Sequence, residues 1–575
     1  MKLVEIAIEN FRGIRGITLP LDNLTVLIGE NNSGKSSVLE ALKLALTRGL
    51  GSRRGGQFAE YDFHLPNSTA TPHGASPVRV TLHFAESTID EWSEPINQQL
   101  NEVIQPDMTS GLGHIWLLIE GSFNTVTEIF ETRWAFLNSH KAELVLKSAS
   151  PINLLQRFVP LFYLSALRDA SQEFGDRGQF WKSFLKSIQI PEADRKPLEL
   201  TLQEINKTVI AASPGLTQVT QQIANAKKLV PLDVTDPVIL EALPTRILDM
   251  VGKIQVHLRS PLGAKLPLHK HGEGTQGLAV LLLFQAFTEA NLAEVYDPDS
   301  TAILALEEPE AHLHPSAIRS LGQFLNQLAG QILVTSHSGD LVSRVPILSL
   351  RRLYSKNNET KVGMVLPGLL SPRETQAIDY NIRLTRGAYL FSRCWLLVEG
   401  ESDFHIIPLV AEALGYSQDE TSFSVLEISQ VTNKGEPFIK FAKALGIQWF
   451  MLADGDAAGA DYTNRAQKYL EPSEVLGDRA YNLAAVDLEH EFWYGGFDTF
   501  ITNLVPTPVQ ANIKATAAGN VPNEVKSLIK TAIITAGGKP AFAQELFAEI
   551  KRRGSGSVPP SIRGVLARVA QLAGG

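Results

Sequence analysis

The chain has 575 residues, of which 44% are hydrophobic and 20% are charged, and its net charge is −9 at pH 7. This length predicts several domains of ordinary globular composition. The single cysteine excludes a disulfide framework and a cysteine zinc cluster, and we find neither a signal peptide nor an apolar segment long enough to span a bilayer. We therefore expect a cytoplasmic protein with no membrane partner.

The acidic net charge gives no global sign of nucleic-acid binding, so any such surface has to be local. Residues 551–553 read Lys-Arg-Arg near the end of the chain. A solvated helix end and a patch that contacts phosphates both fit this run.

A phosphate-binding loop is predicted near the start of the chain. Residues 24–28 form a short apolar run typical of a buried strand, and residues 36–47 have apolar side chains at helical spacing. Between them, residues 29–37 read Gly-Glu-Asn-Asn-Ser-Gly-Lys-Ser-Ser, whose glycines let main-chain N–H groups surround the phosphates of ATP. The lysine adds positive charge and the first serine after it is a Mg²⁺ ligand. The expected contacts with ATP and Mg²⁺ are Gly29, Asn32, Gly34, Lys35, Ser36 and Ser37.

An inserted helical module is predicted between two parts of this domain. Strands at residues 2–9, 78–84 and 115–120 assign residues 1–168 to the first part. Residues 169–251 are polar and helical, and four prolines are expected to break their helices: Pro191, Pro197, Pro214 and Pro231. A narrow apolar seam lies at Leu216, Val219, Ile223 and Ala226. Packing within the chain and dimerisation fit this seam about equally.

The second part, residues 252–385, has two acids at the end of a predicted strand. Residues 302–306 are apolar and are followed by Glu307, Glu308 and Pro309. Because adjacent residues on a strand point to opposite faces, two consecutive acids need a strand end to act together. The pattern resembles the Walker B motif of ABC-type ATPases, which implies that Glu307 contacts Mg²⁺ through water and that Glu308 polarises the attacking water. A solvated turn is the alternative.

Two more loops complete this resemblance. His337 follows the predicted strand at residues 331–335, and it resembles the switch histidine that contacts the γ-phosphate, although a structural loop histidine also fits. Residues 272–277 precede a predicted helix at 278–287 and stand where ABC-type ATPases have the signature loop that caps ATP from the opposite subunit. Their sequence departs from the usual signature, but small residues before a helix favour anion binding. The resemblance implies that Gly274 and Gln276 contact ATP.

A second α/β domain is predicted for residues 386–575, after a joint within 357–386. Its expected strands are residues 394–398, 422–428, 449–453 and 482–486, its expected helices include 403–414 and 436–445, and the tail from residue 521 is helical. This alternation predicts a parallel sheet.

Acidic residues stand at the ends of these strands. Glu399 follows the first strand and Asp454 the third, with Asp456 two residues later. The carboxyl ends of parallel strands share one edge, so these side chains can meet there. Divalent cations relieve the repulsion among such carboxylates, and two of them can hydrolyse a phosphodiester. The pattern resembles a Toprim domain. For Asp403, an exposed acid at a helix start fits about as well as a metal ligand.

Over nearly the whole chain, the order of these motifs resembles the overcoming-lysogenization-defect (OLD) nucleases, in particular those similar to the Gabija nuclease subunit. The resemblance implies a DNA endonuclease that uses ATP and Mg²⁺ or Mn²⁺, with Ca²⁺ also able to occupy the site. It implies self-association into a dimer or higher oligomer through the ATPase side and the insert, a possible superfamily-one helicase partner, and defence against phage. It also adds Asp403, Asp487, Glu489 and Lys539 to the nuclease site, with Glu399, Asp403, Asp454, Asp456 and Glu489 as metal ligands.

We therefore predict an α/β protein with an N-terminal ABC-type ATPase, similar to RecF and SMC ATPases, an inserted helical dimerisation module, and a C-terminal Toprim domain with a helical tail. The competing hypothesis is a DNA-repair ATPase whose Toprim-like module binds DNA without cutting it. A topoisomerase would need a catalytic tyrosine on a second DNA-binding domain, and one cysteine cannot build the zinc module of a primase.

Overall fold

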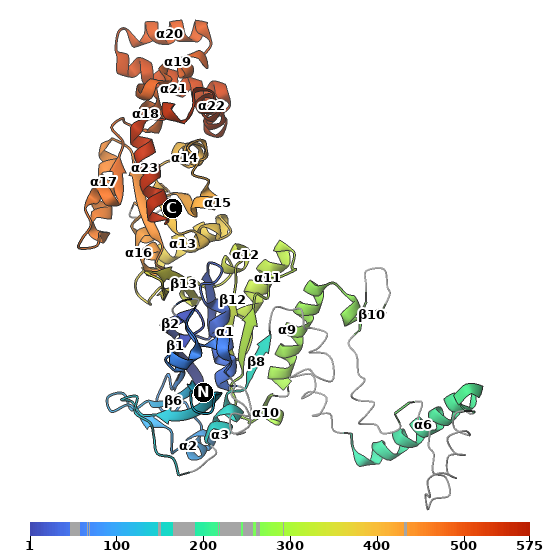
Figure 1. Cartoon of the computed structure of the whole chain (residues 1–575). Helices are drawn as coiled ribbons and strands as arrows, with labels where there is room; N and C mark the ends of the chain where they lie inside the picture. The colour runs from blue at the N-terminus through green and yellow to red at the C-terminus, as the bar shows by residue number, and fades with distance from the viewer. Residues whose placement is uncertain are drawn as a thin grey trace, which may run out of the picture.

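The computed structural model describes residues 1–46, 58–65, 67, 69–147, 151–164, 190–216, 218, 243–244, 257–259, 265–290, 292–429 and 434–574. Within these residues, three large sheets follow one another from the N-terminal to the C-terminal half (Figure 1). Among the described helices, none is both long and apolar enough to cross a membrane.

The first sheet is antiparallel. Its strands, in spatial order, are β2 (Ile14–Pro20), β1 (Lys2–Phe11), β4 (Val78–Ala85), β6 (Gly113–Asn124) and β5 (Gln105–Pro106), and β7 (Ile129–Leu137) also pairs with β6. Apolar side chains such as Ile6 and Ile8 are fully buried on one face. This alternation arises because one face of an antiparallel sheet packs on the core and the other faces water.

The second sheet contains the phosphate-loop strand at its centre. Its order is β14 (Glu359–Met364), β13 (Leu350–Lys356), β3 (Leu24–Gly29), β12 (Gln331–Thr335), β11 (Ile303–Glu307) and β8 (Leu161–Leu164). All pairs are parallel except β13 with β14. Helix α1 (Lys35–Leu46) contacts strands of both sheets and buries Val38, Leu39 and Leu42 between them.

Helices cover the other face of this sheet. They include α9 (Glu273–Ala290), α11 (Pro315–Leu325) and α12 (Gly339–Val342). Phe284 and Phe287 of α9 pack edge-on against Phe162 of β8. The predicted helix at residues 278–287 is therefore confirmed, and it is longer than expected at both ends.

Smaller elements connect these layers. They are α2 (Glu94–Gln99), α3 (Pro151–Phe158), β9 (His257–Arg259), β10 (Lys265–Pro267), α10 (Leu292–Val295), α13 (Pro372–Leu384) and α15 (Gln418–Thr421).

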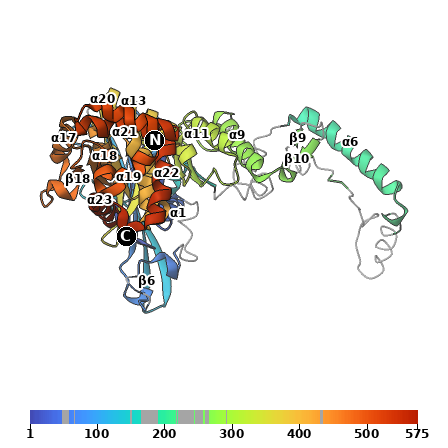
Figure 2. The ribbon, with the colours of Figure 1, turned by 90° about the horizontal axis from the view of Figure 1, so that it is seen from above.

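The described part of the insert is chiefly α6 (Glu192–Ala211), which stands apart from the sheets (Figure 2). Pro197 lies inside this helix, so the expectation that it would break the helix is wrong. A proline removes one main-chain hydrogen bond, and α6 is largely exposed, so water can replace that bond. Leu216 is described, whereas Val219, Ile223, Ala226 and Pro231 lie outside the described residues.

The third sheet is parallel throughout, in the order β16 (Phe423–Glu427), β15 (Cys394–Val398), β17 (Gln448–Ala453) and β18 (Ala480–Asn482). Strand β15 is buried on both faces. Trp395 and Leu397 belong to a core that continues into the second sheet, whereas Leu396 and Val398 face the core of the C-terminal helices. The helices around this sheet are α14 (Glu401–Ala413), α16 (Glu436–Ala444), α17 (Ala457–Ala466) and α23 (Pro560–Leu572).

One expectation for this region is wrong. The strand expected at residues 482–486 ends at Asn482, because the following residues turn around the end of β17, where the N–H of Gly455 donates to the carbonyl of Ala485. The expected helical tail from residue 521 is confirmed, and it begins earlier than that residue. Its helices are α18 (Leu488–Phe492), α19 (Asp498–Asn503), α20 (Thr507–Ala517), α21 (Val521–Ala536) and α22 (Lys539–Arg553).

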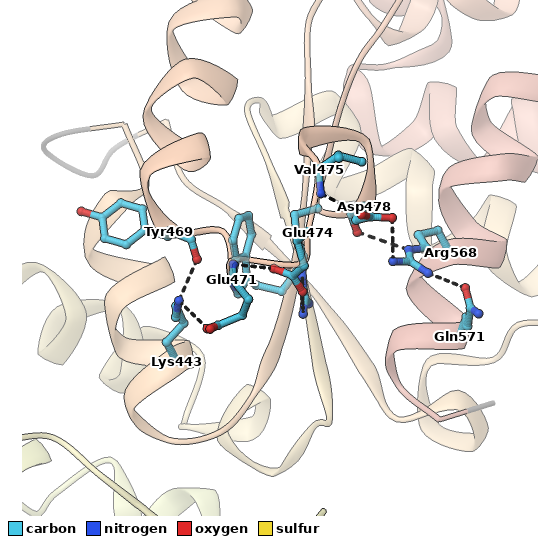
Figure 3. Close-up of polar contacts among 10 residues, drawn as sticks. Lys443, Tyr469, Glu471, Glu474, Val475, Asp478, Arg568 and Gln571 are labelled. Atoms are coloured by element: carbon cyan, nitrogen blue, oxygen red, sulfur yellow. Dashed lines mark hydrogen bonds and ion pairs between the residues drawn. The ribbon is translucent and has the colours of Figure 1, made fainter.

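Polar contacts join the last helix, α23, to the segment that precedes β18 of the third sheet. Arg568 of α23 donates to the carbonyl of Asp478 at 3.2 Å and to its carboxylate at 3.1 Å (Figure 3). The basic run at 551–553 is neutralised within the chain, since Arg552 and Arg553 both pair with Glu549. These pairs favour a solvated helix end at this run.

Candidate nucleotide and metal sites

The phosphate loop follows β3 in a conformation that requires glycine. Gly29 has φ +144°, and a Cβ there would lie 2.2 Å from the carbonyl oxygen of Leu353. Gly34 has φ +100° and directly precedes α1. Such backbone angles are open to glycine and strained for other residues. Asn32 and Ser36 are exposed beside this loop, and Ser37 follows on the first turn of α1.

Lys35 is buried and folds back on the loop. Its Nζ donates to the carbonyls of Gly29 at 2.9 Å and Glu30 at 2.7 Å. Burial lowers the pKa of Lys35 to about 8, partly offset by the charges of Glu308 and Glu30. A phosphate bound in the loop would give this ammonium a stronger partner than two neutral carbonyls.

The two acids after β11 point to different partners. Glu307 accepts a hydrogen bond from the hydroxyl of Tyr163 at 3.1 Å, and the same hydroxyl lies 2.9 Å from Glu40 of α1. Glu308 has φ +44°, and its carboxylate lies 3.5 Å from Nε2 of His337. Burial, followed by the charge of Lys35, lowers the pKa of His337, which favours the neutral imidazole. The structure therefore brings Glu308 and His337 together at the end of the sheet.

Glu310 connects the loop after β11 with the loop that contains His337. The Ser336 hydroxyl donates to Oε1 of Glu310 at 2.6 Å, and the N–H of His337 donates to the same oxygen at 2.9 Å. Burial raises the pKa of Glu310, and its Oε2 has no hydrogen-bond partner. Glu310 thus holds the main chain of the loop that contains His337.

Residues 272–277, which resemble a signature loop, are helical from their second residue, Glu273. Gly274 and Gln276 lie in the first turn of α9, and Gln276 donates to the carbonyl of His271 at 2.6 Å. A Cβ at Gly274 would lie 3.0 Å from the carbonyl oxygen of His312, so this turn packs closely on the loop that follows the two acids.

The second site lies at the carboxyl ends of β15 and β17. The main chain of Asp454 favours the charged form of the Glu399 carboxylate, so these two strand ends lie close together. Gly455 permits the turn, because a Cβ there would lie 2.2 Å from the carbonyl oxygen of Ala485. Asp456 then caps α17 by accepting from the N–H of Gly459 at 2.8 Å, and its charge acts on Glu399.

Three further acids approach from α14 and α18. Asp403 is 5% exposed in the first turn of α14 and accepts from the N–H of Gly400 at 3.0 Å. Glu489 is 7% exposed and accepts from the hydroxyl of Ser402 at 2.6 Å. Asp487 caps α18 and accepts from the N–H of His490 at 2.8 Å. The side chains of the predicted acidic set therefore come from four different elements to one edge of the sheet.

Burial, followed by mutual repulsion, raises the pKa values of this set. Burial raises the pKa of Asp454 to about 8, and the charges of Asp403 and Glu399 add to the shift. Burial likewise raises the pKa of Asp403 to about 7, and Glu489 is the largest contributor among the neighbouring charges. Burial also raises the pKa of Glu489 and Glu399. Carboxylates that destabilise one another in this way favour a cation between them.

Lys539 lies at the margin of this set. Its Nζ is 3.4 Å from the carboxylate of Glu401, and its charge acts on Glu489. The structure places it at the start of α22, next to the acids rather than among them.

The donor set fits a hard divalent cation, which prefers carboxylate oxygens. One such oxygen, Oε2 of Glu399, is buried without a partner. In the part of the chain that the structure describes, however, no three His, Cys, Asp or Glu side chains are gathered to hold one ion. Binding would therefore draw these side chains closer together.

Comparison with known proteins shows which family this chain belongs to. The model of the family described as "Protein of unknown function (DUF2813)" matches residues 1–388. The chain belongs to the DUF2813 family. A second model, described as "Overcoming lysogenization defect protein-like, TOPRIM domain", matches residues 390–456, which include β15, Glu399, Asp454 and Asp456. The resemblance to OLD proteins and to a Toprim domain is thereby confirmed.

This member of the DUF2813 family is similar to three curated proteins. It is 28% identical to the uncharacterized protein YbjD of Escherichia coli K12, with all of both chains covered. It is 22% identical to the Old nuclease of Escherichia phage P2, over 79% of this chain and 77% of that protein. It is 20% identical to the endonuclease GajA of Bacillus cereus VD045, over 70% of this chain and 66% of that protein.

Sequence reasoning did not select three residues that the structure places at these sites. Ser402 directly precedes Asp403, and Glu310 stands two residues after Glu308, so these predicted neighbours were the available signal. Tyr163 lies on β8, far in sequence from either acidic motif, and no local pattern marks it.

Proposed function

We propose that this DUF2813 protein is a DNA endonuclease that depends on a divalent metal and is regulated by ATP. The observation behind this proposal is the convergence of Glu399, Asp403, Asp454 and Glu489 at one sheet edge, with raised pKa values. The OLD-like Toprim match and the nucleases among its relatives support it.

In this proposal each group has a role. Mg²⁺ or Mn²⁺ bound here would supply an activated water and positive charge for the leaving oxygen. Glu399, Asp454 and Asp456 would hold the metal from the ends of β15 and β17, and Asp403 and Glu489 would hold it from α14 and α18. Asp487 orients the start of α18. Lys539 adds positive charge toward the scissile phosphate, which it can reach by leaving Glu401.

The proposed nucleotide site uses ATP and Mg²⁺. Main-chain N–H groups from Gly29 to Gly34 and the Lys35 ammonium bind the phosphates, and Ser36 and Glu307 hold Mg²⁺. Glu308 polarises the attacking water, and His337 contacts the γ-phosphate. We assign Gly274 and Gln276 to the ATP of an opposing subunit, so ATP binding would strengthen a homodimer.

The test is nicking of supercoiled plasmid in Mn²⁺ by the full chain and by Asp454→Ala. We expect cleavage by the wild type and a loss of at least about 100-fold in the variant, as for removal of a group that acts in the transition state. Asp419→Asn, an exposed acid of the same domain, is the matched control and should cut normally. Equal cleavage by wild type and Asp454→Ala would refute the proposed nuclease site.

One observation favours the competing hypothesis, an ATPase whose Toprim-like module binds DNA without cutting it. No three potential ligands are gathered for a single ion within the described residues. Wild-type protein that shifts plasmid in a gel but leaves it intact at every Mn²⁺ and Mg²⁺ concentration would establish this alternative.

The cellular role follows from the same site. We propose defence against phage, with a superfamily-one helicase as partner. Cells that express the wild type should lower phage plating efficiency, whereas cells that express Asp454→Ala should not. Equal plating in both strains would argue against a defence role for cleavage.

A further inference from the structure

The two strands that end at the acidic site, β15 and β17, begin beside the second sheet. Arg352 of β13 lies beside Ile28 of β3, one residue before the phosphate loop. Its guanidinium donates to the carbonyl of Ser392 at 3.1 Å, just before β15, and to the carbonyl of Gly446 at 3.2 Å, just before β17. The Arg352 guanidinium therefore connects the starts of β15 and β17 to β13, which is the neighbour of β3.

A second arginine connects these strands with the phosphate loop itself. Arg393 directly precedes β15, and its guanidinium binds the carboxylate of Glu30 through two hydrogen bonds of 2.6 and 2.7 Å. The carbonyl of Arg393 accepts from the N–H of Gln448, the first residue of β17. Glu30 belongs to the phosphate loop, and its carbonyl is one of the two that hold Lys35.

Strands β15 and β17 can transmit a movement at their first residues to the acids at their ends. Strands β15 and β17 are paired over their whole common length, and β15 is buried on both faces. Close packing makes such elements move as units instead of deforming. A shift of Arg393 would therefore move Glu399 and Asp454 together, relative to Glu489 on α18.

A cavity beside the first residues of β15 and β17 leaves room for the side chains there to take a second arrangement. A cavity of about 330 Å³ is lined by Glu30, Arg352 and Arg393, together with the last residues after α23, Ala573 and Gly574. The Nε of Arg352 is buried with no acceptor, and the Glu30 carboxylate is attracted to Arg352 as well as to Arg393. Glu30 thus has two cationic partners, one on each side of the junction.

We propose that the Glu30–Arg393 ion pair couples nucleotide binding at the phosphate loop to the position of Glu399 and Asp454 relative to Glu489. Phosphates attract Lys35 away from the carbonyls of Gly29 and Glu30, so the loop and the Glu30 side chain move together. Arg393 then shifts the start of β15. This inference rests on the proposed function and assigns Glu30 and Arg393 as positioning residues.

The ion pair is suited to such a role because it is bidentate but half-exposed, with side-chain exposures of 48% for Arg393 and 38% for Glu30. Exposed pairs add little to stability, so a variant should still fold. The bidentate geometry makes the contact directional, which a lysine at this position would not reproduce.

The test measures plasmid nicking by the full chain in Mn²⁺, with and without a non-hydrolysable ATP analogue. The ratio of the two rates measures coupling, and in the wild type we expect a change in either direction of about fivefold or more, as allosteric couplings commonly give. Arg393→Gln should bring the ratio close to one, and Arg393→Lys should give an intermediate ratio. Lys551→Gln, which breaks an exposed pair with Glu412, is the control and should keep the wild-type ratio. A wild-type ratio in Arg393→Gln would overturn the inference.

A second readout separates this inference from the proposed function. By thermodynamic linkage, the analogue must change Mn²⁺ affinity by the factor with which Mn²⁺ changes the affinity of the analogue. Because Mn²⁺ also accompanies the analogue at the phosphate loop, the readout of titration calorimetry is the Mn²⁺ titration step that is absent in Asp454→Ala. The affinity of that step should change with the analogue in the wild type and not in Arg393→Gln, even if the chain cuts no plasmid. If the wild type cuts plasmid but the analogue changes neither its rate nor its Mn²⁺ affinity, the coupling is refuted while the nuclease stands.

Discussion

The carboxylate of Glu399 lies within electrostatic reach of the main-chain N–H of Asp454, at the ends of two neighbouring parallel strands. Its Oε2 is buried without a hydrogen-bond partner. A buried oxygen without a donor is costly, so this position is favourable for a cation.

In metal-free buffer, the stability of the protein should fall as pH rises from about 4 to about 8. The folded chain raises the pKa of Asp403 to about 7 and of Asp454 to about 8, from ordinary values near 3.8. At these two acids the folded state therefore holds more protons than the unfolded state in this window, so their contribution to stability falls as pH rises. His83, whose pKa burial lowers from 6.5 to about 4, opposes them in the lower part of the window. Urea unfolding in EDTA at pH 5 and pH 8 measures the effect.

The Asp454→Asn variant tests the origin of that slope. Asp454 is partly exposed, so solvent screening limits the gain at pH 8 to on the order of 1 kcal/mol in the free energy of unfolding. Asp419→Asn should change nothing. A wild-type stability that rises across the window would contradict the raised pKa values.

Ser402→Ala should weaken Mn²⁺ binding without removing a proposed ligand. The Ser402 hydroxyl donates to Glu489 at 2.6 Å and orients that carboxylate. Loss of such a supporting contact typically lowers metal affinity by about 10- to 100-fold. Titration calorimetry with Mn²⁺ measures it, with Ser527→Ala on the exposed face of α21 as the control. Unchanged affinity would show that Glu489 does not bind the metal or needs no support.

Lys35→Ala should abolish ATP hydrolysis and leave metal-dependent cleavage without nucleotide in place. The Lys35 ammonium is the buried cation of the phosphate loop, and its two present acceptors are main-chain carbonyls. Phosphate release and plasmid nicking are measured on the same preparation. Lys361→Ala, an exposed lysine paired with Glu359, should hydrolyse ATP normally. Normal hydrolysis by Lys35→Ala would remove this loop from the proposed ATP site.

Glu310→Ala should lower kcat for ATP hydrolysis by about tenfold or more, with a smaller effect on KM, because a loosened His337 acts mainly in the transition state. Glu310→Gln keeps an acceptor for Ser336 and the N–H of His337, so its kcat should stay close to that of the wild type. Steady-state kinetics on both variants distinguish the roles. An equal loss in the two variants would indicate that the charge of Glu310, and not its hydrogen bonds, matters.

Strands buried on both faces were the easiest elements to predict. Residues 331–335 and 394–398 form β12 and β15 with the expected bounds, because a parallel strand covered by helices reads as a continuous apolar run. Residues 483–486 are also apolar, yet the chain turns after Asn482, where the N–H of Gly455 donates to the carbonyl of Ala485. That bond joins segments far apart in sequence, so no local pattern could predict it.

The amino-acid sequence by itself determined which chemical groups stand at strand ends: a phosphate loop after β3, two acids after β11, and Glu399 and Asp454 after β15 and β17. Local patterns suffice there, because strand and loop propensities and residue type are properties of short segments. Only the tertiary structure decided that Ser402 supports Glu489, that Glu310 holds the loop of His337, and that Arg393 binds Glu30 across the junction. These contacts depend on how whole sheets and helices pack, and packing brings together residues that no short segment contains.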